Sequence, residues 1–373
     1  MLRQNKLLQN RRFRIFLKTF VISVSVIAGV LALAAAIGAV VLNSTIQPPD
    51  IPVIQAPLPH VHTDSGHAGT ENNDGNTYND EQSEADVTPP VLARYEERRP
   101  LFFTFLIFGL TEGLNANTIM VGAYDGEARR GYVISIPRDT LVDVPRNHRK
   151  IVAAYPSGML GGRGHAGGVN RLKDEVASLV GFRPDFYVRV DYEAFVRLVD
   201  AVGGVEVYVP FHMRYDDPWQ NLHIDIPAGM QLLDGEDALR FARYRRGNRG
   251  FPTISDYQRI EHQQQVIAGA LQRLLTPAAI LQIPEFISIF NSYFSSDLSY
   301  GELLWFANEV RQIYGTDDLS FYTIPMLGTS GAPYWYELAD QAGILELVNR
   351  TINPLMRDIT PSDVRIARWN NPQ

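Results

Sequence analysis

The sequence contains no cysteine. This absence excludes disulfide frameworks, thiolate zinc sites, iron–sulfur clusters and a cysteine nucleophile. It also leaves the chain compatible with an oxidising compartment, because there is no thiol to oxidise. Three familiar catalytic motifs are missing as well, since there is no P-loop, no nucleophile elbow and no zinc-protease helix. Conventional hydrolases and nucleotidases are therefore disfavoured.

Basic residues are scarce outside the N-terminus. Of the 34 Lys and Arg residues, six fall within the first 18 positions, which contain no acid. The rest of the chain carries 28 basic side chains against 41 acidic ones. The rest of the chain is therefore acidic and lacks the broad positive face that is required to bind the phosphate backbone of a nucleic acid. The sequence therefore predicts no nucleic-acid partner.

A run of 23 residues without charge follows, from 20 to 42. About 20 apolar residues cross the hydrocarbon core as a helix, so the run predicts a transmembrane helix. The basic flank, residues 1–19, is expected to stay in the cytoplasm. This topology predicts a single-pass protein of the cell membrane whose remaining residues are extracytoplasmic. A cleaved signal peptide is the alternative, because residues 34–36 are small, although its apolar core is usually shorter.

Residues 43–99 contain several prolines and many small polar residues, without apolar periodicity. Such a composition cannot bury enough apolar surface to offset chain entropy, so it predicts a disordered linker. His60, His62 and His67 lie in it, at a spacing that fits no rigid metal site. The folded domain is expected over 100–355, followed by a C-terminal tail over 356–373.

Strand and helix patterns alternate through the expected domain. The apolar run 102–108 predicts a strand buried on both faces, and the segments 118–124 and 132–136 predict a hairpin. Further strands are expected at 186–190, 205–209 and 319–324, and helices at 169–180, 192–202, 235–244, 256–275, 278–294, 300–314 and 341–349. Asp234 is the expected N-cap of the helix at 235–244. Interleaved strands and helices predict an α/β fold, with helices on both faces of a sheet.

The sequence Gly162–Gly167 matches G-x-G-x-x-G, the pattern of a dinucleotide site. That site needs a strand immediately before the glycines, whereas here a turn precedes them. The match therefore predicts a glycine-rich loop before a helix.

One concentration of cations interrupts the acidic body, at Arg240, Arg243, Arg245, Arg246, Arg249 and Arg259. Guanidinium groups match phosphate oxygens in paired hydrogen bonds, so the group suits a di- or polyphosphate. A solvated helix end is the alternative, because cations are favoured at helix C-termini. Arg138 follows a predicted strand, where ligands of α/β proteins gather, although an ion pair in a turn also explains it.

Six sequence blocks occur in order: SIPRDTLVDVP (135–145), KIVAAYPSG (150–158), YVRVDYEAFVRLVDAVGGVEVYVP (187–210), IDIPAGMQLLDGEDALRFARYRR (224–246), DYQRIEHQQQVIAGAL (256–271) and YTIPMLGTSGAPYWYE (322–337). In these blocks the chain resembles the LytR-CpsA-Psr family, long labelled cell envelope-related transcriptional attenuators. The resemblance implies an α/β/α sandwich around a central mixed sheet, with an apolar tunnel for a polyprenyl chain. It also implies a phosphotransferase of cell wall biogenesis, which moves a glycopolymer from a polyprenyl-pyrophosphate carrier to peptidoglycan.

The resemblance also implies which residues bind the pyrophosphate. They are Arg138, Arg243, Arg245, Arg259 and Gln263, while His262 stands where an arginine is common. The magnesium site of the family is altered. The family has aspartates in a G-x-D and an R-x-D motif, and here the two regions read Phe108-Gly109-Leu110 and Asn115-Ala116-Asn117. Leu110 and Asn117 thus mark a degenerate metal site, because Mg²⁺ needs anionic oxygen and Asn supplies only a neutral carbonyl.

Three explanations of the missing aspartates stay open. The pyrophosphate itself holds Mg²⁺ together with Asn117 and another acid, such as Asp125 or Asp139; or Glu112 replaces the first aspartate; or the protein binds carriers without turnover. The corresponding functions are a phosphotransferase with an altered metal site and a non-catalytic binder that presents carriers. A transcriptional regulator fits the family's label but conflicts with an acidic body outside the membrane.

Overall fold

The computed structural model describes residues 47–50, 98–110, 114–220, 222–274, 283–310, 318–331 and 334–369. The chain divides into two compact units, one comprising residues 1–49 and 299–306 and the other residues 50–298 and 307–373. In the first unit, residues 299–306 open helix α10 (Tyr300–Val310), and Glu302 Oε2 accepts a hydrogen bond from the backbone of Ser299 at 2.6 Å. The sheet and the candidate site belong to the second unit.

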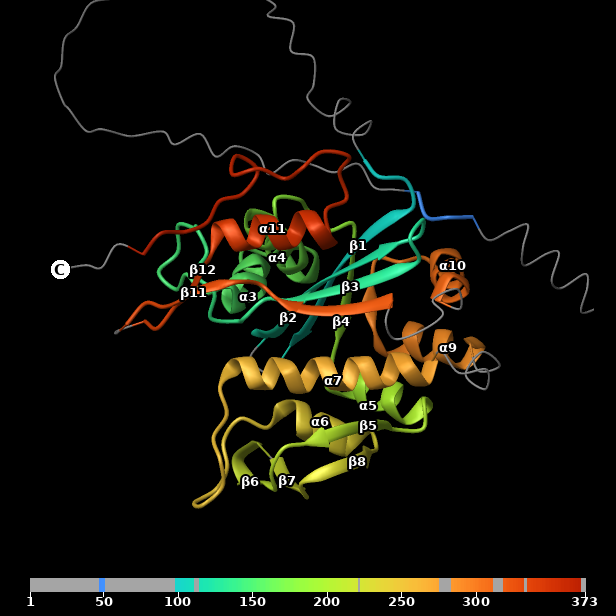
Figure 1. The fold of residues 1–373 in the computed structure, drawn as a ribbon, viewed down its shortest axis with the longest axis vertical. Coiled ribbons are helices and arrows are strands. Elements are labelled where there is room, and N and C mark those ends of the chain that lie inside the picture. The colour runs from blue at the N-terminus through green and yellow to red at the C-terminus, as the bar shows by residue number, and fades with distance from the viewer. Residues whose placement is uncertain are drawn as a thin grey trace, which may run out of the picture. The chain divides into compact units, whose positions relative to one another are not determined.

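A six-stranded mixed sheet organises the second unit (Figure 1), in the order β10-β3-β2-β1-β4-β9. Its strands are β1 (Phe102–Leu110), β2 (Ala116–Asp125), β3 (Arg130–Ser135), β4 (Phe186–Val190), β9 (Ser295–Ser296) and β10 (Leu319–Thr323). The strands β1, β2 and β3 are antiparallel neighbours, whereas β4 runs parallel to β1 and β10 runs parallel to β3. The predicted hairpin and the mixed sheet are confirmed.

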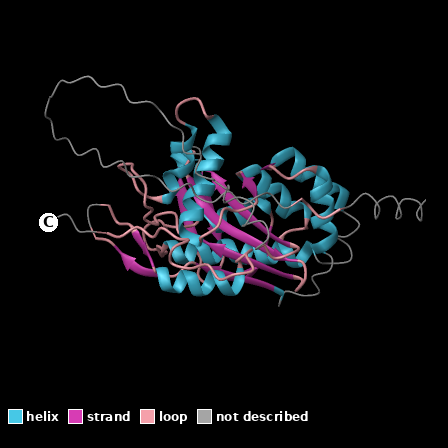
Figure 2. Cartoon of the chain, turned by 90° about the horizontal axis from the view of Figure 1, so that it is seen from above, coloured by secondary structure: helices cyan, strands magenta, loops and turns pink. Residues whose placement is uncertain are grey.

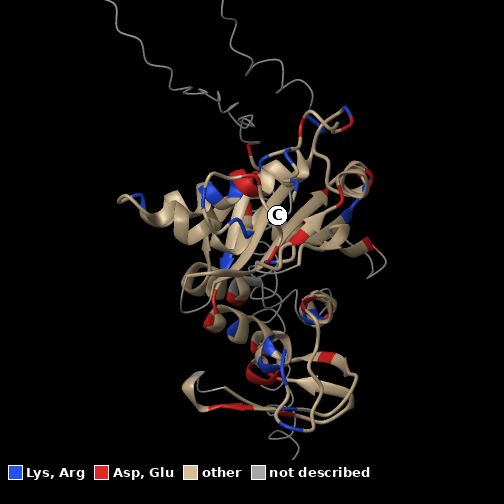
Figure 3. Cartoon of the chain, turned by 90° about the vertical axis from the view of Figure 1, so that its left-hand side faces the viewer, with Lys and Arg blue, Asp and Glu red and all other residues tan. Residues whose placement is uncertain are grey.

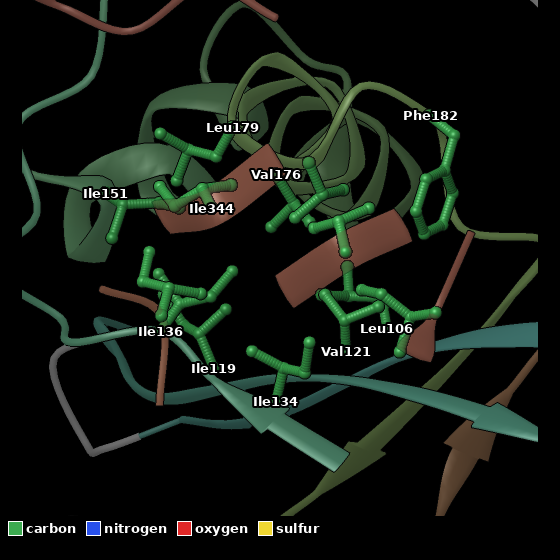
Figure 4. Close-up of a cluster of buried hydrophobic side chains, with 14 of the residues drawn as sticks. Leu106, Ile119, Val121, Ile134, Ile136, Ile151, Val176, Leu179, Phe182 and Ile344 are labelled. Atoms are coloured by element: carbon green, nitrogen blue, oxygen red, sulfur yellow. The ribbon is translucent and has the colours of Figure 1, made fainter. Parts of the chain in front are cut away.

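Helices α3 (Ala154–Met159), α4 (Gly164–Val180) and α11 (Gln341–Thr351) cover one face of this sheet, and the short helix η1 (Ile151–Ala153) precedes α3. Figure 4 shows how the apolar side chains meet there. Leu106 and Val121 from the strands pack with Val176 of α4 and Ile344 of α11, all at most 1% exposed. Alternate strand residues point to the same face, so Phe102, Leu106 and Phe108 of β1 all enter this core.

Helices α3 and α4 approach each other closely through glycine. A Cβ atom on Gly158 would lie 2.3 Å from the carbonyl oxygen of Gly167, and one on Gly168 would lie 2.8 Å from the ring of Tyr155. The helix begins at Gly164, five residues before the predicted start, so part of the G-x-G-x-x-G match is helical. Its later glycines therefore permit close helix packing.

Helix α7 (Asp256–Leu274) lies along the opposite face, where Gln264 Nε2 donates to Ser135 Oγ and to the carbonyl of Tyr322, both at 3.0 Å. Helices α5 (Tyr192–Ala201) and α6 (Gly235–Arg243) pack with it around a second buried cluster. The α6 N-cap is Asp234, as its sequence position suggests, and its Oδ1 accepts from the Asp237 backbone at 2.9 Å. Figure 2 shows the strands with helices around them, which confirms the predicted combination of a mixed sheet with helices.

Smaller elements complete the described residues. Two-stranded ribbons pair β5 (Val205–Val209) with β8 (Gly229–Leu233), β6 (Met213–Asp217) with β7 (Leu222–Ile226), and β11 (Met326–Thr329) with β12 (Glu337–Ala339). The remaining helices are η2 (Pro218–Gln220) and α9 (Ile283–Tyr293). Of these, sequence patterns indicated only β5 and α9.

Buried residues lie outside the expected limits 100–355 at both ends. Arg98, placed in the linker by composition, is 9% exposed. Ile359 and Val364, placed in the tail, belong to the core beneath α4 and α11. Described residues on both sides of the expected limits 100–355 therefore take part in the packed structure. In the described part of the chain no helix is long and apolar enough to span a bilayer. The predicted membrane helix 20–42, its flank 1–19 and all but two residues of the stretch 51–99 lie outside the described residues.

Candidate functional site

Arg138 and Asn117 meet at one end of the sheet. Asn117 opens β2, and Arg138 follows the end of β3. Because the two strands are antiparallel, the start of β2 lies beside the end of β3. Arg138 Nη1 donates a hydrogen bond to Asn117 Oδ1 at 3.0 Å.

The first turn of α7 brings a second guanidinium to the same place. Arg259 Nη2 lies 2.7 Å from Asp256 Oδ1, and it also donates to the Asn117 carbonyl at 3.4 Å. Arg138 Nε lies 3.7 Å from the same Asp256 oxygen. Two guanidinium groups from distant parts of the chain therefore share one carboxylate. Elsewhere basic and acidic segments are interspersed, as the view in Figure 3 shows.

The polar atoms of this group are buried and incompletely satisfied. Arg259 is 7% exposed, and its Nε has no hydrogen-bond partner among the described residues. The same holds for both carboxylate oxygens of Asp256, whose contacts with the arginines lack hydrogen-bond alignment. Burial lowers the pKa of Arg259, Asp256 raises it, and the nearby charges of Arg138 and Arg245 lower it again. A cationic, partly unsatisfied group of this kind is suited to an anion with several oxygen acceptors.

The remaining predicted phosphate ligands divide into two groups. Arg245 lies close enough to Arg259 to affect its pKa, which places it with Arg138. Arg243 instead stacks over the ring of Tyr192 on α5, with 4.5 Å from its Cζ to the ring centroid. Gln263 Nε2 donates to the carbonyl of Ala242 on α6 at 3.5 Å. The structure thus brings Arg138 and Arg259 together on Asp256, with Arg245 near enough to act on the charge of Arg259, and Arg243 and Gln263 contact α5 and α6.

A second charged group borders the first. Lys150 Nζ lies 3.0 Å from Asp139 Oδ1, and Tyr257 Oη donates to Glu337 Oε2 at 3.1 Å. Sequence reasoning identified Asp139 but missed Lys150, Tyr257 and Glu337, and it also missed Asp256. One signal was present, because Asp256 stands three residues before Arg259 in a predicted helix and so lies on its face.

The residues described at Leu110 and Asn117 do not fit the magnesium site that the family pattern implies. Asn117 Oδ1, the only side-chain oxygen at that position, already accepts from a guanidinium. Leu110 packs against the buried core. Counted from Gly109, the third position of G-x-D is in fact Thr111, which lies outside the described residues. Among the residues described, no group of three His, Cys, Asp or Glu side chains is arranged to hold a metal ion.

The acidic residues proposed as substitutes do not supply the missing metal-binding carboxylate beside Asn117. Asp125 ends β2, about 25–30 Å from Asn117 at the usual rise per strand residue, and it pairs with Arg99. Its predicted help to Asn117 is therefore wrong. Asp139 is engaged by Lys150. Glu112 lies outside the described residues.

His262 occupies the interface between α6 and α7. Its ring stacks on Phe241 at a centroid distance of 4.4 Å, and the residue is 4% exposed. Its Nδ1 has no hydrogen-bond partner among the described residues, and burial lowers its pKa to about 4. His262 is therefore a neutral packing residue near pH 7.

A pH dependence of stability follows from this burial. Below about pH 6.5 the unfolded chain binds a proton at His262, whereas the native state resists it until about pH 4. The free energy of unfolding of the wild type should therefore fall between these values by about 3 kcal/mol more than that of His262→Phe. Urea titrations of both proteins at several pH values measure the difference. Parallel curves for the two proteins would show that His262 is accessible to protons.

Apolar side chains on the α7-facing side of the sheet differ in burial, because Phe103, Met120 and Phe186 are at most 4% exposed whereas others are half-buried. Ser135 contacts α7, so its cross-strand neighbours and every second residue beyond them point the same way. On this face Phe105, Ile107, Val133, Val188 and Phe321 are all half-buried. The opposite face carries fully buried residues such as Leu106 and Val121 together with the half-buried Tyr187 and Tyr322.

The sequence is similar to those of bacterial cell-wall proteins. A polyisoprenyl-teichoic acid–peptidoglycan teichoic acid transferase, TagU, of Enterococcus faecalis is 26% identical over 222 residues, covering 57% of this chain and 67% of that protein. The cell wall biosynthesis protein LcpA of Corynebacterium glutamicum is 29% identical over 244 residues, covering 60% of this chain. The match spans only 45% of the length of LcpA.

A solved structure agrees in fold. The crystal structure of Bacillus subtilis TagV superposes with a TM-score of 0.54 at 22% identity, covering 67% of this chain and 95% of that one. The model of the LytR_cpsA_psr family matches residues 70–352, about three quarters of the sequence. With its mixed sheet and clustered arginines, the chain belongs to the LytR_cpsA_psr family.

Proposed function

We propose that this protein binds a polyprenyl-pyrophosphate-linked glycopolymer and transfers the polymer to peptidoglycan. The observation that carries the proposal is the convergence of Arg138 and Arg259 around Asn117 and Asp256. Family membership and the relative named as a teichoic acid transferase support the same reaction class.

The site chemistry suits a pyrophosphate. Each guanidinium offers a planar pair of N–H donors that matches two phosphate oxygens, and burial strengthens such charge-assisted bonds. Arg245 adds a third positive charge near Arg259.

In this proposal the arginine side chains neutralise the negative charge of the pyrophosphate, which a divalent cation would otherwise do. The Arg138 guanidinium lies on Asn117 Oδ1, where an aspartate of the family pattern would offer a negative charge. A cation placed there would meet a neutral amide and a positive guanidinium, which is unfavourable at short range. The proposed site therefore binds its pyrophosphate without Mg²⁺.

A binder without turnover is the second candidate. Its support is the same Asn117–Arg138 contact, because a bound metal normally contributes several kcal/mol to stabilising charge on a transferring phosphate. In that case the arginines hold the carrier and present it to assembly partners. Transfer of polymer to peptidoglycan by the purified protein separates the two candidates.

The proposed location follows from the substrate. Polyprenyl carriers reside in the cytoplasmic membrane, and the charge-free run at 20–42 has the length of a membrane span. We place the domain on the extracytoplasmic side, because six basic residues and no acid precede this run in the N-terminal flank.

Binding of a short-chain prenyl pyrophosphate to the full chain in detergent tests the proposal. Calorimetry should give the same affinity, within about twofold, in EDTA and in Mg²⁺, because guanidinium groups supply the countercharge. Mg²⁺ titrated into the protein alone should bind weakly, and Asn117→Asp should strengthen that binding by restoring an anionic oxygen.

Two results would contradict the proposal. Absence of prenyl pyrophosphate binding under both conditions would remove the proposed function. Binding that is lost in EDTA would show that a metal site forms from other residues. Glu346→Gln, a change at an exposed position of α11, serves as the control for handling and folding.

A further inference from the structure

Glu337 lies beside the arginine cluster and comes from a distant part of the chain. It opens β12, where its backbone N–H donates to the carbonyl of Asp139 at 3.0 Å. Its own carbonyl accepts from the Leu141 backbone at 2.9 Å. These two bonds fix Glu337 against the segment that begins with Arg138. Its backbone position is therefore set by the same loop that positions a proposed phosphate ligand.

The Glu337 carboxylate is held at one oxygen only. Oε2 accepts from Tyr257 Oη at 3.1 Å, and no hydrogen bond to Oε1 comes from any residue that the structure describes. Tyr257 is the second residue of α7 and follows Asp256, the carboxylate shared by Arg138 and Arg259. One oxygen is thus oriented by the helix that also carries a proposed phosphate ligand, and the other is available to a ligand.

The charged neighbours of Glu337 come from each segment packed around it. They are Asp256 and Tyr257 on α7, Asp139 after β3, and Lys150 before η1. Partial burial raises the pKa of Glu337, the Tyr257 hydrogen bond lowers it, the charges of Asp139 and Asp256 raise it, and Lys150 lowers it. The pKa of Tyr257 is itself raised by burial, so its hydroxyl remains a donor. A carboxylate with an elevated pKa is a more effective proton acceptor than an exposed one.

We infer that Glu337, oriented by Tyr257, accepts the proton of the acceptor hydroxyl in the transfer, an inference that rests on the proposed function. The acceptor oxygen forms a bond to the sugar-linked phosphorus of the carrier. The bond from that phosphorus to the bridging oxygen breaks, and prenyl phosphate leaves with the electron pair. The hydroxyl proton passes to Oε1 of Glu337. The arginines hold the pyrophosphate, and Glu337 activates the nucleophile.

A structural role is the alternative reading of the same contact, because the Tyr257–Glu337 bond also ties α7 to β12. Glu337→Gln separates the two roles. Glutamine keeps an acceptor oxygen for Tyr257 and nearly the same volume, but it cannot take up a proton. A purely structural hydrogen bond to Tyr257 would be kept in this variant, whereas the ability to accept a proton would be lost.

The experiment uses the full chain in detergent, a short-chain prenyl-pyrophosphate-linked saccharide as donor and a soluble peptidoglycan glycan strand as acceptor. Glu337→Gln should bind the donor as the wild type does but transfer it at least about 100-fold more slowly. The wild-type rate should rise with pH as Glu337 loses its proton and then level off. Tyr257→Phe should move that rise to higher pH, because it removes a bond that lowers the Glu337 pKa.

The outcomes distinguish this inference from the function on which it rests. Wild-type protein that does not bind the donor overturns the proposed function and the inference together. Wild-type protein that binds the donor but transfers nothing overturns the inference and leaves carrier binding standing. A Glu337→Gln rate within about threefold of the wild type, with an unchanged pH profile, overturns the inference alone. Glu346→Gln, which makes the same chemical change at an exposed site on α11, should match the wild type throughout.

Discussion

Replacing Arg138 and Arg245 together by glutamine is expected to weaken binding of a short-chain prenyl pyrophosphate by on the order of a thousandfold. Each hydrogen bond to a charged group contributes about 1.5–3 kcal/mol. Arg138 shares Asp256 with Arg259, and the charge of Arg245 acts on Arg259. Arg259 remains in this variant and still pairs with Asp256, so no buried carboxylate is abandoned. Calorimetry on the full chain in detergent measures the change.

The control removes the same charge elsewhere. Arg130 and Arg197 are both exposed, and Arg130→Gln with Arg197→Gln lowers the net charge equally. This control should bind within about threefold of the wild type, because exposed charges at a distance are screened by salt. Equal losses in the two double variants would mean that net charge, and not the Arg138 cluster, governs binding.

Replacing Arg98 by alanine is expected to reduce the free energy of unfolding by about 3–5 kcal/mol. The side chains of Arg98 and Asp185 form a buried ion pair, with exposures of 4% and 1%. Asp185 Oδ2 also accepts from the backbone and hydroxyl of Thr104, both at 2.8 Å, but these neutral donors do not balance its charge. Loss of the guanidinium would leave this buried carboxylate without its direct ion-pair partner, because the nearby Lys173 Nζ donates to the Asp185 carbonyl and pairs with Asp297. Urea unfolding of the full chain, followed by circular dichroism, measures the effect.

A paired substitution identifies the cause. Arg98→Met with Asp185→Asn removes both charges, so it should be clearly more stable than Arg98→Ala. Arg130→Ala, at an exposed position, should change stability by less than about 0.5 kcal/mol. A loss below about 1 kcal/mol in Arg98→Ala would indicate that water reaches Asp185 in solution.

The elements that sequence predicted well have strong local patterns. The apolar run of β1 and the Asp234 cap of α6 belong to this group. Elements without such a pattern were missed. Strand β9 has only two residues, both serine, and β6 reads MRYDD, which has one apolar residue facing the core. Such strands depend on the partner that they pair with, so their own residues carry little information.

In the candidate site, too, some residues were predicted from sequence and others were not. Arg138 and Arg259 were predicted to converge from block resemblance, and the structure places both on Asp256. Glu337 could not be connected to Tyr257 from sequence, because 80 positions separate them and neither forms a recognisable motif. The error at Asp125 has a simple cause. Asp125 and Asn117 are near in sequence, but a strand separates them by its full length.

The burial of Arg98 has a mechanical consequence for the chain that precedes it. The backbone of Arg98 forms an isolated β-bridge with Leu355, and the Arg99 backbone N–H donates to the Pro354 carbonyl at 2.8 Å. The Arg98 guanidinium is paired with Asp185, just before β4. A pulling force applied to the chain before residue 98 therefore acts first on these contacts and only then on β1. Two segments far apart in sequence, around 185 and 355, share that tension, so β1 is protected from being peeled out of the sheet from its first residue. A domain joined at this point can be pulled from its N-terminal side while its arginine cluster, at the opposite end of β2, keeps its geometry.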